Sequence, residues 1–390
     1  MPLDDFFLRN SMDRFSEEKC IMIIAGETSG DIHGAKLVSA MRKRHNRLFF
    51  CGIGGRALGE AGVRLLIDAS EIAVVGITEV FSKIPNILKG LRVAKKALKT
   101  LHPDLLILID FPDFNLHLAS FAKKLGIPVL YYISPQIWAW RPGRVKRIGE
   151  LVDHLAVILP FEEDFYRGHK IPVTFVGHPL LDTDASPQNK ALTGGTKDYP
   201  VIGFLPGSRD GEIGRHLPIM INAARNLHRK IDNVKFLISL APEVKRTYVE
   251  GIIKKHKTGF AFELVADSSQ KVLERSTLVV AASGTVTLEA AISGTPMVII
   301  YKVSPISYWI GRAMIQVKHI GLANLIAGRK IVPELLQKEA SPTRISDTVF
   351  EMLSDSSGLE RIRLELLNIR DLLGGPGASE RVADIALGMM

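Results

Sequence analysis

The chain alternates short, unbroken apolar runs with longer amphipathic segments, and this pattern constrains its fold more than any other feature. Runs such as CIMIIAG (20–26), LLILID (105–110) and PVLYYIS (128–134) are separated by segments with helical periodicity. A strand that is apolar on both faces needs cover on both faces, as in a parallel sheet flanked by helices. The sequence therefore predicts an α/β fold built from doubly wound parallel sheets.

The alternation stops once, at a polar segment rich in glycine and proline, and then starts again. Because the chain has 390 residues, one ordinary core cannot hold it and two domains are expected. We expect Rossmann-like domains over 1–183 and 201–341, a linker over 184–200, and helices over 342–390, one of which can cross back to the first domain. Ligands of doubly wound sheets bind at the carboxyl ends of the strands, so functional residues are expected there.

Charge and cysteine content narrow the classes of partner and compartment. A net charge of +9 suits nucleic acid, anionic lipid or phosphorylated substrates, although solvated lysines and arginines on helix surfaces give the same charge. Only Cys20 and Cys51 are present and there is no CxxC pair, so we expect no disulfide framework, no metal-thiolate site and a reducing compartment such as the cytoplasm. We also expect neither a signal peptide nor a membrane-spanning segment.

The stretch LLILIDFPDFN (105–115) places a carboxylate, Asp110, directly after a buried strand. An unpaired buried carboxylate is costly, so it needs partners or a chemical role. Asp113 follows a proline and is predicted to be the N-cap of a helix that begins near Phe114. The two acids are thus expected to divide, with Asp110 catalytic and Asp113 structural.

Three glycine-containing turns join a strand to a helix, and each brings polar side chains to a strand end. A helix N-terminus and an arginine can bind a diphosphate, and a carboxylate one turn inside a helix can accept hydrogen bonds from ribose hydroxyls. Each turn can equally be an ordinary capped junction, with Ser29 or Asp31 as the cap of the first. No GxGxxG pattern supports a dinucleotide site. The candidate residues are Glu27, Ser29, Ser208, Arg209, Ser283, Gly284, Thr285 and Glu289.

The segment YYISPQIWAWRPGRVKRI (131–148) interleaves Trp138 and Trp140 with basic residues that begin at Arg141. Such a pattern can stack on nucleic acid, line a sugar or lipid pocket near phosphates, or form core tryptophans beside a basic helix. Its place after a strand end favours a loop beside a ligand. His178, in VGHPLLD, is isolated from other metal-ligating residues and is expected to be structural.

Taken together, these motifs resemble the lipid-A-disaccharide synthases, a family of glycosyltransferases that join two acylated glucosamine units. The resemblance follows the chain in order over nearly its whole length. The fragments that carry it are GETSGDIHGA, GIGG, VVGITEV, DFPDFN, YYISPQIWAWRPGRVKRI, LPFEEDFY, VGHPL, LPGSR, SGTVTLEAA, PMVIIY and LANLIAGRKIVPELLQ. One departure is GLANLIAG, where the family more often has Ser-Leu-Pro-Asn.

The resemblance implies a GT-B fold, in which two Rossmann-like domains face each other across a cleft. It implies UDP-2,3-diacylglucosamine as donor, 2,3-diacylglucosamine 1-phosphate (lipid X) as acceptor, and a β(1→6) disaccharide formed with inversion, without cofactor or metal. Asp110 would be the base, and Glu27, Ser29, Trp138 and Arg141 would lie on the acceptor side. The implied donor-site residues are Ser208, Arg209, Ser283, Gly284, Thr285, Glu289, Asn324 and Gln337.

Residues 77–99 combine apolar side chains with six lysines and arginines, a pattern typical of a segment at an anionic lipid surface. The alternative is an amphipathic helix packed on the sheet. The candidate membrane contacts are Val80, Phe81, Ile84, Ile87 and Leu88. We therefore expect a cytoplasmic protein that associates peripherally with the inner membrane, and the sequence leaves a homodimer open.

Two other functions compete with this interpretation. A sugar-nucleotide 2-epimerase has the same GT-B architecture and similar phosphate turns, but it does not need the basic and aromatic segment, and turnover of UDP-GlcNAc alone would identify it. A non-catalytic RNA-binding protein would use the positive charge and show a steep salt dependence. No RRM or KH signature supports it, so we expect no nucleic-acid partner.

Overall fold

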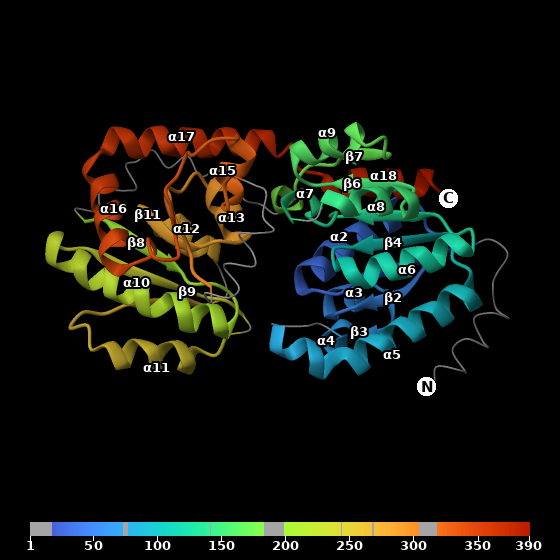
Figure 1. Ribbon diagram of the computed structural model, residues 1–390, viewed down its shortest axis with the longest axis horizontal. Helices are drawn as coiled ribbons and strands as arrows, with labels where there is room; N and C mark the ends of the chain where they lie inside the picture. Colours follow the sequence, from blue (N-terminus) through green and yellow to red (C-terminus); the bar gives the residue numbers. More distant parts are fainter. Residues whose placement is uncertain are drawn as a thin grey trace. The chain divides into compact units, whose positions relative to one another are not determined.

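The computed structural model describes residues 18–72, 77–140, 142–182, 199–242, 244–266, 269–303 and 318–390. The chain divides into two compact units: unit 1 comprises Met1–Thr183 with Gly374–Met390, and unit 2 comprises Asp184–Leu373 (Figure 1). Each unit contains one wholly parallel sheet with helices on both faces. The predicted α/β class with two doubly wound, Rossmann-like units is confirmed.

Unit 1 contains a seven-stranded sheet with the strand order β3-β2-β1-β4-β5-β6-β7. Its strands are β1 (Lys19–Ala25), β2 (Leu48–Gly54), β3 (Arg64–Asp68), β4 (Leu105–Ile109), β5 (Val129–Tyr132), β6 (His154–Val157) and β7 (Val173–Phe175). Its helices are α2 (Thr28–Arg44), α3 (Arg56–Glu60), α4 (Ala69–Ile72), α5 (Ile77–Leu101), α6 (Pro112–Lys124), α7 (Ile137–Trp140), α8 (Val145–Leu151), α9 (Pro160–Gly168) and α18 (Ala378–Gly388).

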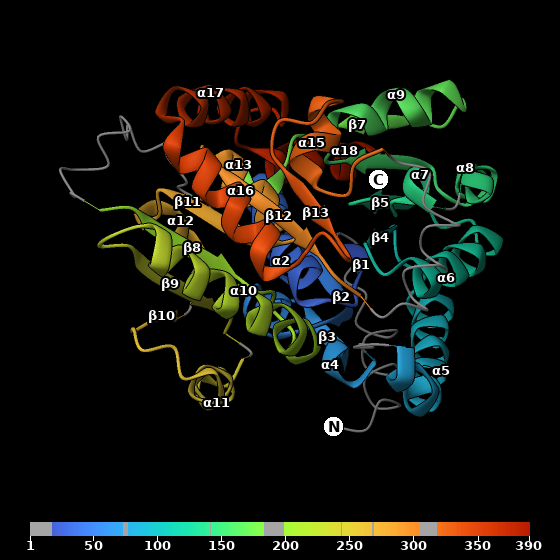
Figure 2. The ribbon, with the colours of Figure 1, turned by 60° about the vertical axis from the view of Figure 1, so that its left-hand side comes forward.

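The central strands of unit 1, β1 and β4, read as continuous apolar runs because both of their faces are buried. In β1, Met22 and Ile24 pack into the core beneath α5, α6 and α8, whereas Ile21 and Ile23 pack into the core beneath α2, α3 and α18. Figure 2 shows α2 on one side of the strands and α5, α6 and α8 on the other. Successive side chains of a strand point to opposite faces, so alternate residues fill the two cores.

Unit 2 contains a six-stranded sheet with the order β10-β9-β8-β11-β12-β13. Its strands are β8 (Val201–Leu205), β9 (Lys235–Leu240), β10 (Glu263–Ala266), β11 (Leu278–Ala282), β12 (Met297–Tyr301) and β13 (Glu334–Leu336). Its helices are α10 (Asp210–Lys230), α11 (Arg246–His256), α12 (Ser269–Arg275), α13 (Val286–Ile292), α15 (Leu322–Ala327), α16 (Pro342–Ser354) and α17 (Ser356–Leu372).

The last helix, α18, belongs to unit 1, whereas α16 and α17 belong to unit 2. Helix α18 packs against α2 and buries Val382, Ala383 and Ala386. The carboxylate of Asp182 binds its N-terminus and accepts hydrogen bonds from the backbone N–H groups of 377, 378 and 379 at 2.8, 3.0 and 3.1 Å, as well as from the Ser379 hydroxyl at 2.9 Å. A helix begins with unpaired N–H groups, which this carboxylate satisfies.

The expected cap at Asp113 is wrong, and the alternative cap at Ser29 or Asp31 does not occur either. Helix α6 begins at Pro112, one residue after the N-cap Phe111, so Asp113 lies inside the first turn, where it pairs with Arg144 at 2.7 Å. Proline favours the first helical position because its missing N–H has no partner there, and this moves the start ahead of Asp113. Helix α2 has Glu27 at its N-cap without a side-chain hydrogen bond, so neither Ser29 nor Asp31 caps it.

Candidate active site

The turn after β4 holds Asp110 in a constrained backbone. Asp110 and Phe111 have φ values of +46° and +48°, and two successive non-glycine residues in this region are strained. The carbonyl oxygen of Asp110 accepts hydrogen bonds from the Tyr131 hydroxyl and the Asn115 amide, both at 2.6 Å. The same amide also donates to the carbonyl of Ile109 at 3.2 Å. These buried donors fix the direction in which the Asp110 side chain leaves the strand.

A glycine in the turn after β1 makes room for the turn after β4. A Cβ atom built on Gly26 would lie 2.3 Å from the ring of Phe111, so a larger residue would displace that ring. Phe111 in turn stacks on Phe114 with ring centroids 5.1 Å apart. Because β1 and β4 are neighbours in the sheet, this contact places the beginning of α2 beside Asp110.

The surroundings of Asp110 change its acidity. Burial, and then the negative charge of Glu27, raise the pKa of Asp110 to about 6, although a hydrogen bond from the N–H of Phe111 partly opposes this. Glu27 and Ser29 are both exposed at the start of α2. A base with a pKa near the working pH combines the ionised form with a useful proton affinity. The structure thus brings Glu27 into electrostatic contact with Asp110.

The GIGG turn at 52–55 is a structural junction within unit 1. The carboxylate of Asp31 accepts hydrogen bonds from the backbone N–H groups of Gly55, Ala57 and Leu58 at 2.6, 2.8 and 3.2 Å. Asp31 therefore caps α3, a helix that follows it by 25 residues in sequence (Asp31 to Arg56). The glycines of the turn leave space for the Asp31 carboxylate, since a Cβ on Gly55 would lie 2.8 Å from Asp31 Oδ2.

Trp138 lies in the short helix α7, within the segment that follows β5, and is half-buried. Its indole Nε1 donates a hydrogen bond to the buried carboxylate of Glu162 at 3.0 Å. Arg141 and the side chain of Trp140 lie outside the described residues. Sequence reasoning did not single out Glu162, although it occupies the third position of a helix that begins with proline, where a carboxylate often serves a cap.

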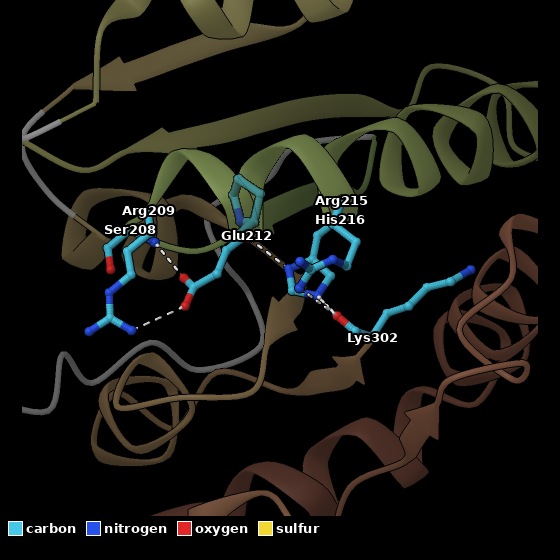
Figure 3. Close-up of polar contacts among 7 residues, drawn as sticks. Ser208, Arg209, Glu212, Arg215, His216 and Lys302 are labelled. Atoms are coloured by element: carbon cyan, nitrogen blue, oxygen red, sulfur yellow. Dashed lines mark hydrogen bonds and ion pairs between the residues drawn. The ribbon is translucent and has the colours of Figure 1, made fainter. Parts of the chain in front are cut away.

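In unit 2, the turn after β8 carries Ser208 and Arg209, and both are exposed or half-exposed at the start of α10 (Figure 3). The Glu212 carboxylate accepts a hydrogen bond from the Ser208 backbone N–H at 3.2 Å and lies 3.7 Å from the Arg209 guanidinium. A Cβ on Gly207, whose φ is +118°, would lie 2.5 Å from Glu212 Oε2. A carboxylate of the protein therefore contacts the donors that could bind an anionic ligand.

One turn further along α10, a second group of contacts joins the ends of β8 and β12. His216 Nδ1 lies 3.0 Å from the carbonyl oxygen of Pro206, and Nε2 lies 3.2 Å from that of Lys302. Arg215 also donates to the Lys302 carbonyl at 3.3 Å (Figure 3). Through these contacts, α10 is tied to the backbone that follows β8 and to the backbone that follows β12.

The turn after β11 exposes Gly284 and Thr285. The backbone N–H of Ser283 is used within the sheet, because it donates to Ile300 at 2.9 Å. Glu289, on α13, accepts a hydrogen bond from the Ser269 hydroxyl. Burial raises the pKa of Glu289, and this hydrogen bond partly opposes the change. Glu289 is therefore held in place inside unit 2.

Asn324, on α15, and Gln337, directly after the edge strand β13, differ in how many of their side-chain amide atoms have hydrogen-bond partners. Asn324 is fully buried: its amide group donates to Val332 and Glu334, and its oxygen accepts from the N–H groups of Ile331 and Val332, all within 2.7–3.0 Å. Gln337 follows β13 with a φ of +50°. Its Nε2 is buried and has no hydrogen-bond partner among the described residues.

The apolar side chains of α5 separate into two groups. Ile84 and Leu88 are 41% and 46% exposed, whereas Ile87 is partly buried against the core of unit 1. Val80 and Phe81 have side chains outside the described part of the chain. The residues on the exposed side fit the expected surface contact, but Ile87 does not, because it packs inward. No helix in the described ranges is long and apolar enough to cross a membrane.

His178, for which the sequence predicts a structural role, lies just after β7 in unit 1. It is buried, and its Nδ1 accepts a hydrogen bond from the N–H of Leu180 at 3.2 Å. Burial, and then the nearby His33, lower the pKa of His178 to about 3, so the ring is neutral. Within the described ranges, no group of three or more His, Cys, Asp or Glu residues could hold a metal ion.

Comparison with known proteins relates this arrangement to one family. A family model described as lipid-A-disaccharide synthetase matches residues 21–378. The chain is 48% identical over 373 residues to the lipid-A-disaccharide synthase of Syntrophus aciditrophicus, which covers 95% of this chain and 97% of that protein. It is 44% identical over 374 residues to the synthase of Geobacter sulfurreducens, with the same coverage of 95% and 97%.

Solved structures share the fold at much lower identity. The UDP-GlcNAc 2-epimerase of Neisseria meningitidis bound to UDP-GlcNAc has a TM-score of 0.63 at 14% identity, over 95% of this chain and 100% of that chain. CalG4, the calicheamicin glycosyltransferase, has a TM-score of 0.59 at 16% identity, over 95% and 99%. These likenesses concern the fold alone, because epimerases and glycosyltransferases both have it.

Proposed function

The chain belongs to the lipid-A-disaccharide synthetase family, and from this premise we propose its reaction and the residues that carry it. The proposed reaction transfers the diacylglucosaminyl group of UDP-2,3-diacylglucosamine to lipid X. It forms the β(1→6) disaccharide 1-phosphate with inversion and releases UDP. The acceptor is assigned to unit 1 and the nucleotide to unit 2.

The observation that carries the proposal is the strained backbone of Asp110, whose carbonyl oxygen is held by Tyr131 and Asn115 while its carboxylate has a raised pKa. In the proposed step, Asp110 takes the proton of the acceptor's primary hydroxyl while that oxygen attacks the anomeric carbon of the donor. The bond from this carbon to the diphosphate oxygen breaks, and UDP leaves. A raised pKa suits a base of this kind, and the hydrogen bonds to the Asp110 carbonyl keep the carboxylate oriented.

The turn after β8 supplies the proposed contacts for the departing diphosphate. Arg209 and the backbone N–H of Ser208 stabilise its negative charge, with the exposed turn at Gly284 and Thr285 as a further contact. The Glu212 carboxylate now bound to Ser208 repels an incoming diphosphate, so donor binding requires Glu212 to move away. Glu212 thereby sets the affinity of the turn for anions.

Three other predicted donor residues take different roles in this proposal. Glu289 accepts hydrogen bonds from the ribose hydroxyls in exchange for Ser269. Gln337 contacts the donor directly, because its buried Nε2 needs an acceptor. Asn324 has no hydrogen-bonding capacity left, so we assign it a positioning role: it holds the segment from α15 to β13 on which Gln337 depends.

The protein is further proposed to act at the inner membrane surface from the cytoplasm. Its substrates carry fatty acyl chains, and the exposed Ile84 and Leu88 lie on a helix with several cations. Apolar side chains beside lysines are suited to insertion among anionic lipid headgroups. This association brings the enzyme to its substrates.

One assay tests the proposed reaction: release of UDP from UDP-2,3-diacylglucosamine, measured with and without lipid X. We expect UDP release that depends on lipid X, with disaccharide 1-phosphate formed in equal amount. A parallel incubation with UDP-GlcNAc alone addresses the epimerase alternative. Epimerised UDP-GlcNAc without disaccharide formation would overturn the proposal.

A further inference from the structure

Glu162, in the first turn of α9, is a buried carboxylate that the proposed reaction does not use. Its exposed fraction is 1%. Oε1 accepts hydrogen bonds from the Trp138 indole at 3.0 Å and the Ser134 hydroxyl at 3.2 Å, and Oε2 accepts one from the N–H of Leu159 at 3.0 Å. All three partners are neutral donors, so the carboxylate acts as an acceptor for several groups at once.

The loop that Glu162 holds begins with a strained residue. Ile133, directly after β5, has a φ of +59°, which is a genuine outlier for a β-branched side chain. Such a conformation persists only where surrounding contacts enforce it, and it is concentrated at functional sites.

Helix α9 provides two more contacts to the same loop. The Tyr166 hydroxyl, one turn after Glu162, donates to the carbonyl of Pro135 at 3.2 Å. The Phe161 ring meets the Trp138 ring edge-on, with centroids 4.8 Å apart. Three hydrogen bonds and one ring contact from a single helix thus hold this segment, and one of each reaches the indole itself.

The loop starts beside the proposed base. Strands β4 and β5 are paired neighbours, with Ile109 opposite Tyr132, so Asp110 and Ile133 leave the same edge of the sheet at adjacent positions. A half-buried indole in such a loop presents an amphipathic surface to a ligand. We propose that Glu162 is a positioning residue that holds Trp138 as a wall for the acceptor sugar, an inference that rests on the proposed function.

The chemistry of the site explains why a carboxylate is needed there. A carboxylate only accepts hydrogen bonds, whereas the glutamine amide would direct an NH₂ group at one of the N–H or O–H donors. Glu162→Gln therefore keeps the size of the side chain but breaks part of the network. Trp138→Phe removes the same hydrogen bond from the other side and leaves the buried carboxylate in place.

Steady-state kinetics of the full-length enzyme test this role, with the KM for lipid X measured separately from the KM for the donor. We expect Glu162→Gln and Trp138→Phe each to raise the acceptor KM about tenfold, which corresponds to the loss of one hydrogen bond. The donor KM should stay within about twofold, because those contacts are made elsewhere. The double variant should be no worse than the more affected single variant, since both changes remove one interaction.

Glu163→Gln is the matched control. Glu163 is the next residue of α9, pairs with Arg167 at 3.0 Å and accepts from the N–H of Phe175 at 3.2 Å, so its loss perturbs the helix without touching Trp138. An unchanged acceptor KM in both Glu162→Gln and Trp138→Phe, with only a lower Tm, would reduce Glu162 to a structural role. A wild-type enzyme that forms no disaccharide would overturn the proposed function itself, and this inference with it.

Discussion

The hydroxyl of Tyr131, in the middle of the sheet of unit 1, donates a hydrogen bond of 2.6 Å to the main-chain carbonyl of Asp110. Tyr131 is fully buried in β5, and Asp110 follows the neighbouring strand β4. The bond therefore crosses between two strands and holds the strained turn that carries the proposed base. A fully buried side chain of one strand thus holds the backbone of the residue proposed as the base on the next strand.

Tyr131→Phe should slow turnover without abolishing it. The substitution keeps the buried ring and removes one hydrogen bond, worth about 1 kcal/mol, so we expect kcat to fall about five- to tenfold. Tyr199→Phe is the control, because the Tyr199 hydroxyl lies in unit 2, where it accepts a hydrogen bond from Lys235 Nζ at 2.9 Å. A lower Tm with unchanged kcat would mean that the bond stabilises the fold but does not orient Asp110.

Asp110→Asn should lower kcat by about 10²–10⁴, since it keeps the shape and removes the base. Donor affinity, measured by UDP binding, should stay near that of the wild type. In the wild type, activity should fall below about pH 6 as Asp110 becomes protonated. Glu27→Gln removes one cause of the raised pKa and should move this acid limb to lower pH. An unmoved limb would exclude Asp110 as its origin.

Asp110→Asn should also raise the thermal stability of the protein above neutral pH. Folding raises the pKa of Asp110 from 3.8 to about 6, so the folded state binds this proton more tightly than the unfolded state. The resulting stabilisation is complete below about pH 4 and is lost as the pH rises through 6. Asp110→Asn should therefore raise Tm at pH 8 and change it little at pH 4. Equal changes at both values would contradict a buried, charged Asp110.

Arg209 and Glu212 should have opposite effects on UDP affinity, measured by calorimetry. Arg209→Ala should weaken binding about 10- to 100-fold, as expected for a charge-assisted contact. Glu212→Gln removes a competing negative charge and should tighten binding several-fold. Weaker binding by Glu212→Gln would show that this carboxylate orders the turn instead of competing with the diphosphate. EDTA should leave turnover unchanged in each variant.

Asp182→Ala should loosen the C-terminal helix from unit 1. The loss leaves three N–H groups of the α18 N-terminus without their partner, which costs about 1–3 kcal/mol. Partial burial alone would raise the pKa of Asp182, but the hydrogen bonds from residues 377–379 lower it. Its contribution is thus present above the unfolded pKa and is lost in acid. Asp384→Ala, at an exposed pair with Arg44, should change Tm far less.

Lipid binding should depend on the exposed side of α5 and not on its buried side. The double variant Ile84→Glu, Leu88→Glu should lose co-sedimentation with anionic vesicles and keep its Tm, because both side chains face solvent. Ile87→Glu should lower Tm, because that residue packs on the core. Continued sedimentation of the double variant would remove this helix as the membrane contact.

Local pattern was enough to predict the α/β class and the strands around Asp110 and Arg209. Unbroken apolar runs indicate strands that are buried on two faces, and a glycine near a strand end indicates a tight strand–helix turn. Both features can be predicted from residues that are close in sequence. The same local rules failed for Asp113 and Asp31, where several residues could serve as the cap. Proline at the first helical position decided the first case, and a turn two dozen residues away decided the second.

By itself, the sequence determined the two-unit α/β architecture, the strand-end position of Asp110 and the resemblance to one family, because these depend on periodicity and on order along the chain. Only the tertiary structure decided which groups surround each candidate: Tyr131 on the carbonyl of Asp110, Glu162 on Trp138, Glu212 on the turn after β8, and the four partners of the Asn324 amide. The reason is physical. Hydrogen bonds and pKa values depend on distances of a few ångströms between residues that strand order and register bring together, and one chain position says nothing about such a neighbour.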